Sequence, residues 1–272
     1  MTAIVIIPAR YHSTRFPGKP LSLLKGKALI QHVYENSTGA HLIGDVIVAT
    51  DSEEIFEKVL SFGGKSVMTR AIHPSGTDRI AEAAAPLNYD IVVNVQADEP
   101  LVHPQMIDDV ISVLHDERAS MGTLIKRITE PEEVIDPNVV KVVIDEEGFA
   151  LYFSRSPIPY HRDKWKLLNI GQIAQNTPSL TLPPRGQVWG GDSEFQTLRF
   201  YKHIGIYSYR KETLLALSRM EPSELEKIEK LEQLRALEKG IRIKTKETLF
   251  ETIGVDTPED LERVERCLST SL

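Results

Sequence analysis

Short apolar runs alternate with segments of helical periodicity along the chain. The apolar runs are rich in β-branched residues and cover residues 3–7, 45–49, 91–95 and 139–144. Runs of this length and continuity are typical of strands covered on both faces, as in parallel sheets. Apolar residues recur with helical spacing at 29–34, 55–60 and 107–114. The alternation of strands and helices predicts an α/β fold with an open, mostly parallel sheet between two layers of helices.

Start and stop signals predict two further helices in the C-terminal part. Residues 224–239 follow a capping box formed by Ser223 and Glu226 and end at Gly240. A second helix is expected to begin after Thr257, with a proline at its first position. Asp256 then lies just before a helix N-terminus, where a carboxylate is stabilised and can face a cation.

The periodicity is lost between residues 165 and 198, where prolines and glycines are frequent. Segments of this length without internal structure are often lids, binding loops or disordered regions. We therefore expect a single domain over residues 1–272, with an inserted loop or arm at about 165–198. A dimerisation arm, a lid and a disordered insertion all remain open for this segment.

Four cations follow the first predicted strand. Arg10, Arg15 and Lys19 lie in the segment 6–20, and Lys25 follows it. Three prolines and a glycine prevent a helix here. Because neither GxxxxGK[ST] nor GxGxxG is present, the positive charge must come from side chains spread along the loop. Arginine and lysine side chains suit phosphate oxygens, so the loop predicts a polyphosphate site. The alternative is a solvated basic loop.

Two aspartates follow predicted strands and have prolines close by. Asp98 lies in the sequence QADEP after the run at 91–95, and Asp256 follows an apolar stretch. Ligands of open α/β sheets bind outside the carboxyl ends of the strands. Mg²⁺ is commonly held by one or two carboxylates, with water and phosphate completing its coordination. The pair therefore predicts a magnesium site, whereas the alternative is a turn or capping role for each aspartate.

The segment 73–79, HPSGTDR, precedes a helical pattern. A helix N-terminus presents unpaired amides, so this segment is a candidate for binding an anion or a base edge. The alternative is that Ser75 or Thr77 caps the helix and that Arg79 forms a salt bridge.

Composition narrows the class of protein. The chain has 272 residues, 41% hydrophobic and 26% charged, with a net charge of −7. This balance is typical of a globular protein and argues against nucleic-acid binding. The apolar N-terminal run is too short for a membrane span and lacks a preceding basic region, so we expect a cytoplasmic protein without membrane association. The single cysteine, Cys267, cannot form an intrachain disulfide.

Ten motifs in order resemble one known family. They are IPARYHSTRFPGKPL, VATD, GGKSVMT, HPSGTDRIAE, VNVQADEPL, PNVVKVV, ALYFSRSPIPY, HIGIYSYR, LEQLRALE and GVDTPEDLERV. Together they resemble the 3-deoxy-manno-octulosonate (Kdo) cytidylyltransferase family, also called the CMP-Kdo synthetases. The resemblance covers nearly the whole chain except the segment at about 165–198.

The resemblance implies an enzyme of the nucleotide-diphospho-sugar transferase fold. Members transfer CMP from CTP to the acid sugar Kdo, release pyrophosphate and serve lipopolysaccharide synthesis, and the resemblance also implies a homodimer and Mg²⁺. Carried over by motif, the resemblance assigns triphosphate binding and catalysis to Arg10, Arg15 and Lys19, and the metal to Asp98 and Asp256. It assigns the rest of the nucleotide to Ser75, Arg79 and Gln96. The residues that it places around the sugar are Gln96, Arg155, His203, Tyr207, Glu232 and Gln233.

The implied reaction needs positioning and charge stabilisation more than covalent catalysis. Attack of a sugar hydroxyl on the α-phosphorus increases negative charge on the surrounding oxygens, which cations stabilise. For Arg155, His203, Glu232 and Gln233, the alternative interpretation is surface pairing or capping.

Two departures from the family pattern qualify the resemblance. Ala97 replaces the usual glycine, and its methyl group is expected to impede close approach of the nucleotide or to forbid a positive φ. The segment at 165–198 is longer than the family pattern. A related acid sugar, either an 8-amino analogue or a sialic acid, remains an alternative substrate. A non-catalytic nucleotide-binding module is a second alternative, although retention of Lys19, Asp98 and Asp256 favours an enzyme.

Overall fold

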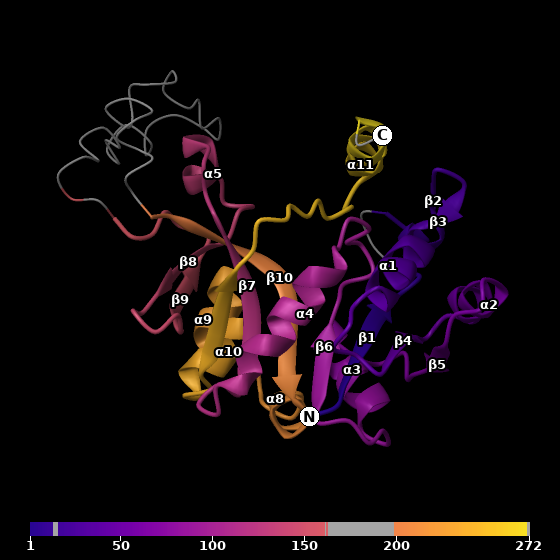
Figure 1. The fold of residues 1–272 in the computed structure, drawn as a ribbon, viewed down its shortest axis with the longest axis horizontal. Coiled ribbons are helices and arrows are strands. Elements are labelled where there is room, and N and C mark those ends of the chain that lie inside the picture. The colour runs from indigo at the N-terminus through magenta and orange to yellow at the C-terminus, as the bar shows by residue number, and fades with distance from the viewer. Residues whose placement is uncertain (13–15, 161, 163–198, 271–272) are drawn as a thin grey trace.

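A mixed, mostly parallel β-sheet runs through the centre of the molecule (Figure 1). The computed structural model describes residues 1–12, 16–160, 162 and 199–270, and Arg15 and the whole segment at 165–198 lie outside this part. The strand order is β11-β7-β10-β6-β1-β4-β5, and β8 and β9 extend the sheet beside β10. The strands are β1 (Ala3–Ala9), β4 (Asp45–Thr50), β5 (Ser66–Met68), β6 (Ile91–Asn94), β7 (Met121–Arg127), β8 (Lys141–Ile144), β9 (Ala150–Ser154), β10 (Tyr201–Arg210) and β11 (Ile243–Glu247).

Strand directions agree with a fold of the doubly wound type. Strands β6, β1, β4 and β5 are parallel, β10 is antiparallel to both β6 and β7, and β11 is parallel to β7. Consequently the carboxyl ends of β1, β4 and β6 lie at one edge of the sheet, as predicted. A separate hairpin of β2 (Leu23–Leu24) and β3 (Lys27–Ala28) follows the basic loop.

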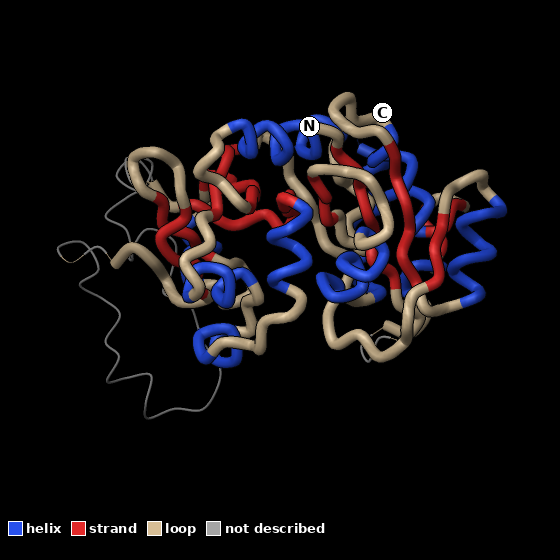
Figure 2. The backbone as a smooth tube through the Cα atoms, turned by 90° about the horizontal axis from the view of Figure 1, so that it is seen from below, coloured by secondary structure: helices blue, strands red, loops and turns tan. Residues whose placement is uncertain are grey.

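Helices cover both faces of the sheet (Figure 2). One layer contains α1 (Leu29–Thr38), α2 (Glu53–Ser61) and α4 (Pro104–Ser112), and the other contains α3 (Gly76–Ala84), α8 (Lys211–Leu217), α9 (Glu224–Glu229) and α10 (Gln233–Glu238). The alternation of side chains in β1 explains the two layers. Val5 and Ile7 belong to the first apolar cluster, whereas Ile4 and Ile6 belong to the second. Full burial on both faces accounts for the continuous apolar run.

The remaining helices lie at the ends of the sheet. They are α5 (Pro131–Ile135), α11 (Pro258–Thr270) and the short 3₁₀ helices η1 (Lys19–Leu21) and η2 (Val113–His115). Helix α11 lies next to the β2–β3 hairpin (Figure 1) and packs Val264 against Leu24 and Leu29. This small cluster joins the basic loop to the C-terminal segment. None of the helices in the described part of the chain has both the length and the apolar character needed to cross a membrane.

Two sequence predictions about the elements are wrong in detail. The run at 139–144 becomes β8, which pairs antiparallel with β9 and β10, so it does not belong to the parallel layer. The predicted helix 224–239 is divided into α9 and α10 because Lys230 adopts a left-handed conformation with φ of 56°. The capping box of Ser223 and Glu226 is confirmed, and Gly240 takes the positive φ expected after a helix end.

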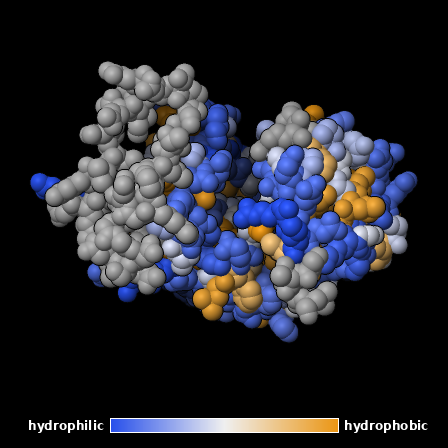
Figure 3. All heavy atoms as spheres, turned by 90° about the horizontal axis from the view of Figure 1, so that it is seen from above, coloured by the Kyte–Doolittle hydropathy of each residue, from blue (hydrophilic) through white to orange (hydrophobic). Residues whose placement is uncertain are grey.

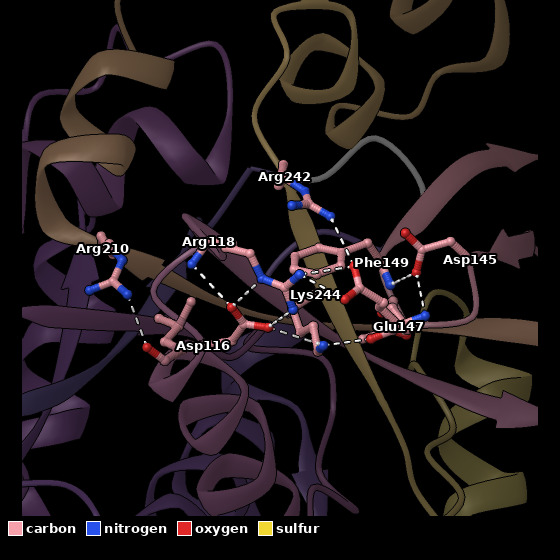
Figure 4. Close-up of polar contacts among 11 residues, drawn as sticks. Asp116, Arg118, Asp145, Glu147, Phe149, Arg210, Arg242 and Lys244 are labelled. Atoms are coloured by element: carbon pink, nitrogen blue, oxygen red, sulfur yellow. Dashed lines mark hydrogen bonds and ion pairs between the residues drawn. The ribbon is translucent and has the colours of Figure 1, made fainter.

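A polar cluster lies at the start of β11, beside the turn between β8 and β9 (Figure 4). Arg118 donates to both Asp116 and Glu147, and Lys244 contacts the same two residues. The cations of Arg118, Arg242 and Lys244 lie 5.2, 3.7 and 4.4 Å from the centre of the Phe149 ring. Hydrogen bonds from Arg118 contribute most to holding the pKa of Asp116 far below its usual range. The cluster fixes the β8–β9 turn to the sheet.

Candidate active site

The basic loop bends back on itself directly after β1. Gly18 has a φ of 69°, which favours glycine, and its amide donates to Tyr11 O at 2.9 Å. The 3₁₀ helix η1 then begins at Lys19 and turns that side chain toward the sheet edge. Arg10 is exposed, and its guanidinium donates to Pro74 O at 3.2 Å. The loop therefore reaches the segment 73–79, from which it is remote in sequence.

Lys19 links the two aspartates that the sequence analysis paired. Its Nζ lies 2.7 Å from Asp98 Oδ2 and 3.3 Å from Asp256 Oδ1. The aspartates come from the end of β6 and from the segment before α11. The amide of Val255 donates to Asp98 O at 2.9 Å, which holds the two segments together through the backbone. The predicted convergence of loop cation and carboxylates is present in the structure.

The N-terminus of α11 is capped as predicted. Thr257 Oγ1 accepts from Asp260 N at 3.3 Å, and Thr257 N donates to Asp260 Oδ2 at 2.9 Å. This reciprocal pair satisfies two amides and fixes the chain direction immediately after Asp256.

Glu99 is a third carboxyl group at this site, and the sequence analysis did not select it. Burial raises the pKa of Glu99 to about 8, and the neighbouring negative charge of Asp98 adds to the effect. A hydrogen bond from Thr252 opposes the shift, and Oε2 is buried with no hydrogen-bond partner in the described part of the chain. Its place beside Asp98 in QADEP was the available signal, but burial could not be read from the sequence.

A cavity of about 230 Å³ lies along β6 and β10. Its lining comes from α3, α8, β7, β10, β6 with the loop after it, and α10 with the residue before it. The lining residues are Gly76, Thr77, Asn94, Gln96, Met121, Tyr207, Tyr209, Leu217, Glu232 and Gln233. Gln96, Tyr207, Glu232 and Gln233 were predicted as site residues. Figure 3 shows that the face above the strand ends is hollowed between two halves and bordered by hydrophilic residues.

Two polar groups on α10 and just before it make the cavity suitable for a polar ligand. Gln233 is only 5% exposed, and its Nε2 has no hydrogen-bond partner among the described residues. A buried amide without a partner costs stability, so a ligand acceptor there is favourable. Burial raises the pKa of Glu232, and contacts from the Thr77 and Ser75 hydroxyls oppose this shift. Gln96 donates to Asn94 Oδ1 at 2.8 Å, which orients it at the cavity wall.

His203 lies behind Tyr207 on β10. Its ring centre is 5.2 Å from those of Phe153 and Tyr207, and Nε2 is 2.9 Å from Thr123 Oγ1. Burial lowers the pKa of His203 to about 3, so the imidazole is neutral near pH 7. Burial also raises the pKa of Tyr207 well above its ordinary value. Both rings therefore act as uncharged groups, and His203 is outside the cavity lining.

Ser75 and Arg79 serve the protein itself in this structure. Ser75 caps α3 by accepting from Asp78 N. Arg79 is fully buried, and its guanidinium lies 3.0 Å from Asp51 Oδ2 and donates to Thr69. These are the capping and salt-bridge roles of the alternative interpretation, so direct contact of Arg79 with a nucleotide stays a prediction.

Arg155 is likewise engaged by the protein. Its Nε donates to Glu229 O and its Nη1 to Pro137 O, both at 2.8 Å, and its amide donates to Glu229 Oε2. It is outside the cavity lining, so its contact with a sugar also stays a prediction.

Ala97 is accommodated without backbone strain. In the described part of the chain, residues other than glycine with positive φ are Lys25 and Lys230, so Ala97 keeps an ordinary conformation. It is 8% exposed and belongs to an apolar cluster. This backbone needs no positive φ at Ala97, so the methyl group causes no strain there. The expectation that it impedes close approach of the nucleotide stays a prediction.

The carboxylates fit a hard cation that also has other ligands. No group of three or more histidine, cysteine or acidic side chains arranged to hold a metal occurs among the described residues. Asp98 and Asp256 nevertheless converge on one cationic atom, Lys19 Nζ. Two carboxylate groups with water and phosphate oxygens are a common Mg²⁺ environment.

Comparisons with known proteins identify the family of this chain. A family model described as Cytidylyltransferase matches residues 4–244. A 3-deoxy-manno-octulosonate cytidylyltransferase of Geobacter metallireducens is 52% identical over 272 residues, covering 99% of this chain and 98% of that protein. The protein of the same name from Thermodesulfovibrio yellowstonii is 48% identical over 278 residues, covering 99% of each.

A solved structure is also similar over its full length. The CMP:2-keto-3-deoxy-manno-octonic acid synthetase complexed with CTP superimposes with a TM-score of 0.84 at 38% sequence identity and covers all of both chains. These proteins resemble this chain in sequence and in length, and the solved structure also resembles it in fold. The chain belongs to the cytidylyltransferase family, and within it to the 3-deoxy-manno-octulosonate cytidylyltransferases.

Proposed function

We propose that this protein transfers CMP from CTP to Kdo and releases pyrophosphate. The observation that carries the proposal is the meeting of Lys19, Asp98 and Asp256 beyond the carboxyl end of β6. Relatives that match nearly the whole chain are named for the same reaction. A CTP complex of a similar protein supports CTP as the nucleotide.

The triphosphate is assigned to the basic loop. Arg10 is exposed at the loop end, and Lys19 lies at the carboxylates. Arg15 is assigned with them from the sequence motif, since it lies outside the described residues. These cations offset the charge that develops on the departing pyrophosphate, where preorganised positive groups have their largest effect.

Mg²⁺ is assigned to Asp98 and Asp256, whose oxygens come within hydrogen-bond distance of one point. When bound, the ion would polarise a phosphoryl oxygen and lower the pKa of a hydroxyl ligand. Both carboxylates occur on separate segments joined by the Val255 amide, so the chain itself keeps the ligands together.

The acid sugar is assigned to the cavity. The orphan amide of Gln233 is a donor for a sugar oxygen, and Glu232 can accept from a sugar hydroxyl. Tyr207 closes one wall and remains protonated because burial raises its pKa. A mostly buried site orders the attacking hydroxyl and excludes competing water.

Family membership extends the proposal to the biological setting. We assign the protein to lipopolysaccharide synthesis, to the cytoplasm and to a homodimeric state, following the motifs of the sequence. Sedimentation of the purified chain tests the dimer directly.

A substrate panel tests the proposed function. Pyrophosphate release is measured with CTP, Mg²⁺ and, in turn, Kdo, its 8-amino analogue and a sialic acid. We expect turnover to be fastest with Kdo. Faster turnover with the amino analogue or the sialic acid would change the assigned sugar, and no release with any of the three would contradict the reaction and support a non-catalytic nucleotide-binding module.

A further inference from the structure

Lys19 occupies the position between the carboxylates that a metal ion would need. Its Nζ is within hydrogen-bond distance of Asp98 Oδ2 and within 3.3 Å of Asp256 Oδ1. The Lys19 side chain is 12% exposed, compared with 30% for Asp98 and 48% for Asp256. The ammonium is therefore the most enclosed of the three charges.

The backbone contacts that join the segments of the two carboxylates do not involve Lys19. The Val255 amide holds their segments together, and the capped start of α11 fixes the chain after Asp256. Two like charges at this spacing repel each other and need a cation. Glu99 is a further carboxyl group beside them. Lys19 supplies one positive charge to a pair that carries two negative charges.

An ammonium and a divalent ion compete for the same carboxylate oxygens. Lys19 must leave the pair when a divalent ion takes it, and its charge then needs a new anionic partner. The long, flexible side chain of Lys19 starts from the loop that is assigned to the triphosphate, so its ammonium can move to a phosphate oxygen of the bound nucleotide. Without a triphosphate, the same displacement leaves an ammonium in a partly buried site with no counter-ion, which is costly.

From this geometry we propose that Lys19 is a resident counter-cation that couples metal binding to triphosphate binding. With no nucleotide present, Lys19 holds the carboxylates and weakens binding of a divalent ion. When CTP is present, Lys19 transfers its ammonium to the phosphates and releases Asp98 and Asp256 to the metal. Coupling of this kind is reciprocal, so the metal also strengthens CTP binding through Lys19. The proposal rests on the proposed function for the identity of the nucleotide.

Binding of Mn²⁺ to the protein alone tests the competition without any turnover. Electron paramagnetic resonance titration compares the wild type with Lys19→Met, Lys19→Arg and Lys25→Met. Lys19→Met should bind Mn²⁺ about tenfold more tightly, within the usual range of coupling between sites. Lys19→Arg keeps the charge and should bind as weakly as the wild type. Lys25 is exposed in the turn between β2 and β3, outside the basic loop, so Lys25→Met should leave the affinity unchanged.

A double variant and a folding control complete the Mn²⁺ experiment. The double variant Lys19→Met with Asp256→Asn should lose the gain in affinity, which shows that the ion uses the carboxylate pair. Thermal unfolding confirms that each variant is folded. Equal or weaker Mn²⁺ binding by folded Lys19→Met would overturn the counter-cation role. Because this measurement uses neither CTP nor sugar, it is independent of pyrophosphate release, which tests the proposed function.

Discussion

His203 is an imidazole whose charge the fold suppresses. Packing against Phe153 and Tyr207 leaves the ring only partly accessible to solvent, and burial lowers its pKa to about 3, compared with about 6.5 in an unfolded chain. Below pH 6.5 the unfolded state binds a proton that the folded state does not bind. Folding stability that is present above pH 6.5 is therefore lost as the pH falls toward 3.

This linkage predicts a pH effect specific to His203. Between pH 7 and pH 5, the neutral histidine should reduce the free energy of unfolding by about 2 kcal/mol. Urea denaturation of the wild type and of His203→Gln at both pH values measures this contribution. The variant should lose about 2 kcal/mol less than the wild type over that interval. An equal loss in both proteins would show that His203 is protonated in the folded state.

Ala97 is a small departure from the family pattern that the fold accommodates. Its methyl group is buried in an apolar cluster, and its backbone is unstrained. Ala97→Gly should therefore lower the free energy of unfolding by about 1 kcal/mol, because glycine increases the entropy of the unfolded chain. Pyrophosphate release should be unchanged. Denaturation and the activity assay check both parts, and a marked gain in turnover would show that the methyl group obstructs the nucleotide.

At the scale of elements, the break between α9 and α10 depends on one residue. Lys230 adopts a left-handed conformation that costs about 1 kcal/mol for a residue with a Cβ. Lys230→Gly should raise the free energy of unfolding by about that amount. The matched control is Lys227→Gly within α9, which should lower it by about 1 kcal/mol. Urea denaturation distinguishes the two, and destabilisation by both variants would contradict the assignment of strain to Lys230.

The segment that carries Asp256 is tied to the sheet by ion pairs. Glu251 lies 2.7 Å from Lys126 Nζ and 2.8 Å from Lys202 Nζ, and Phe250 stacks on His103. Burial would raise the pKa of Glu251, but hydrogen bonds from both lysines outweigh it and keep the pKa below its ordinary value. These contacts reinforce the backbone bond between Val255 and Asp98.

Removing the negative charge of Glu251 should loosen the segment that carries Asp256. In Glu251→Gln, the Val255 amide is expected to exchange with deuterium about fivefold faster, corresponding to ~1 kcal/mol for partly exposed ion pairs. Glu247→Gln, an exposed position on β11, is the control and should leave exchange unchanged. Unaltered exchange in Glu251→Gln would show that the backbone bond alone holds the segment.

Most of the parallel part of the fold could be predicted because its strands are buried on both faces. The runs that became β1, β4 and β6 are continuous and apolar for that reason. The antiparallel position of β8 could not be predicted, since partner choice depends on contacts with β10, which is remote in sequence. The break at Lys230 was also hidden, because lysine carries no turn signal.

Site residues could be predicted where their charge and position in the sequence identified them. They could not be predicted where their role depends on burial in the folded protein. Lys19 and Asp98 follow β1 and β6, whose carboxyl ends meet at one edge. The prediction that Asp256 also follows a strand is wrong, because residues 248–257 form no strand and Asp256 reaches the site from the segment before α11. By contrast, Arg79 and Arg155 look like ligand-binding cations in the sequence, but Asp51 and Glu229 engage them in the structure. Glu99 and the unpartnered amide of Gln233 became visible only with the packing around them.

At the scale of the whole molecule, we propose that CMP transfer depends on the carboxylates of Asp98 and Asp256. The most direct test is the rate of pyrophosphate release from CTP, Kdo and Mg²⁺ by Asp98→Ala, Asp256→Ala and the control Asp90→Ala, whose carboxylate lies at the opposite edge and accepts from Thr2 N. We expect a loss of at least about a hundredfold in the first two variants, which is the scale for removing an essential electrostatic group, and an unchanged rate in the control. Wild-type rates in folded Asp98→Ala and Asp256→Ala would contradict it.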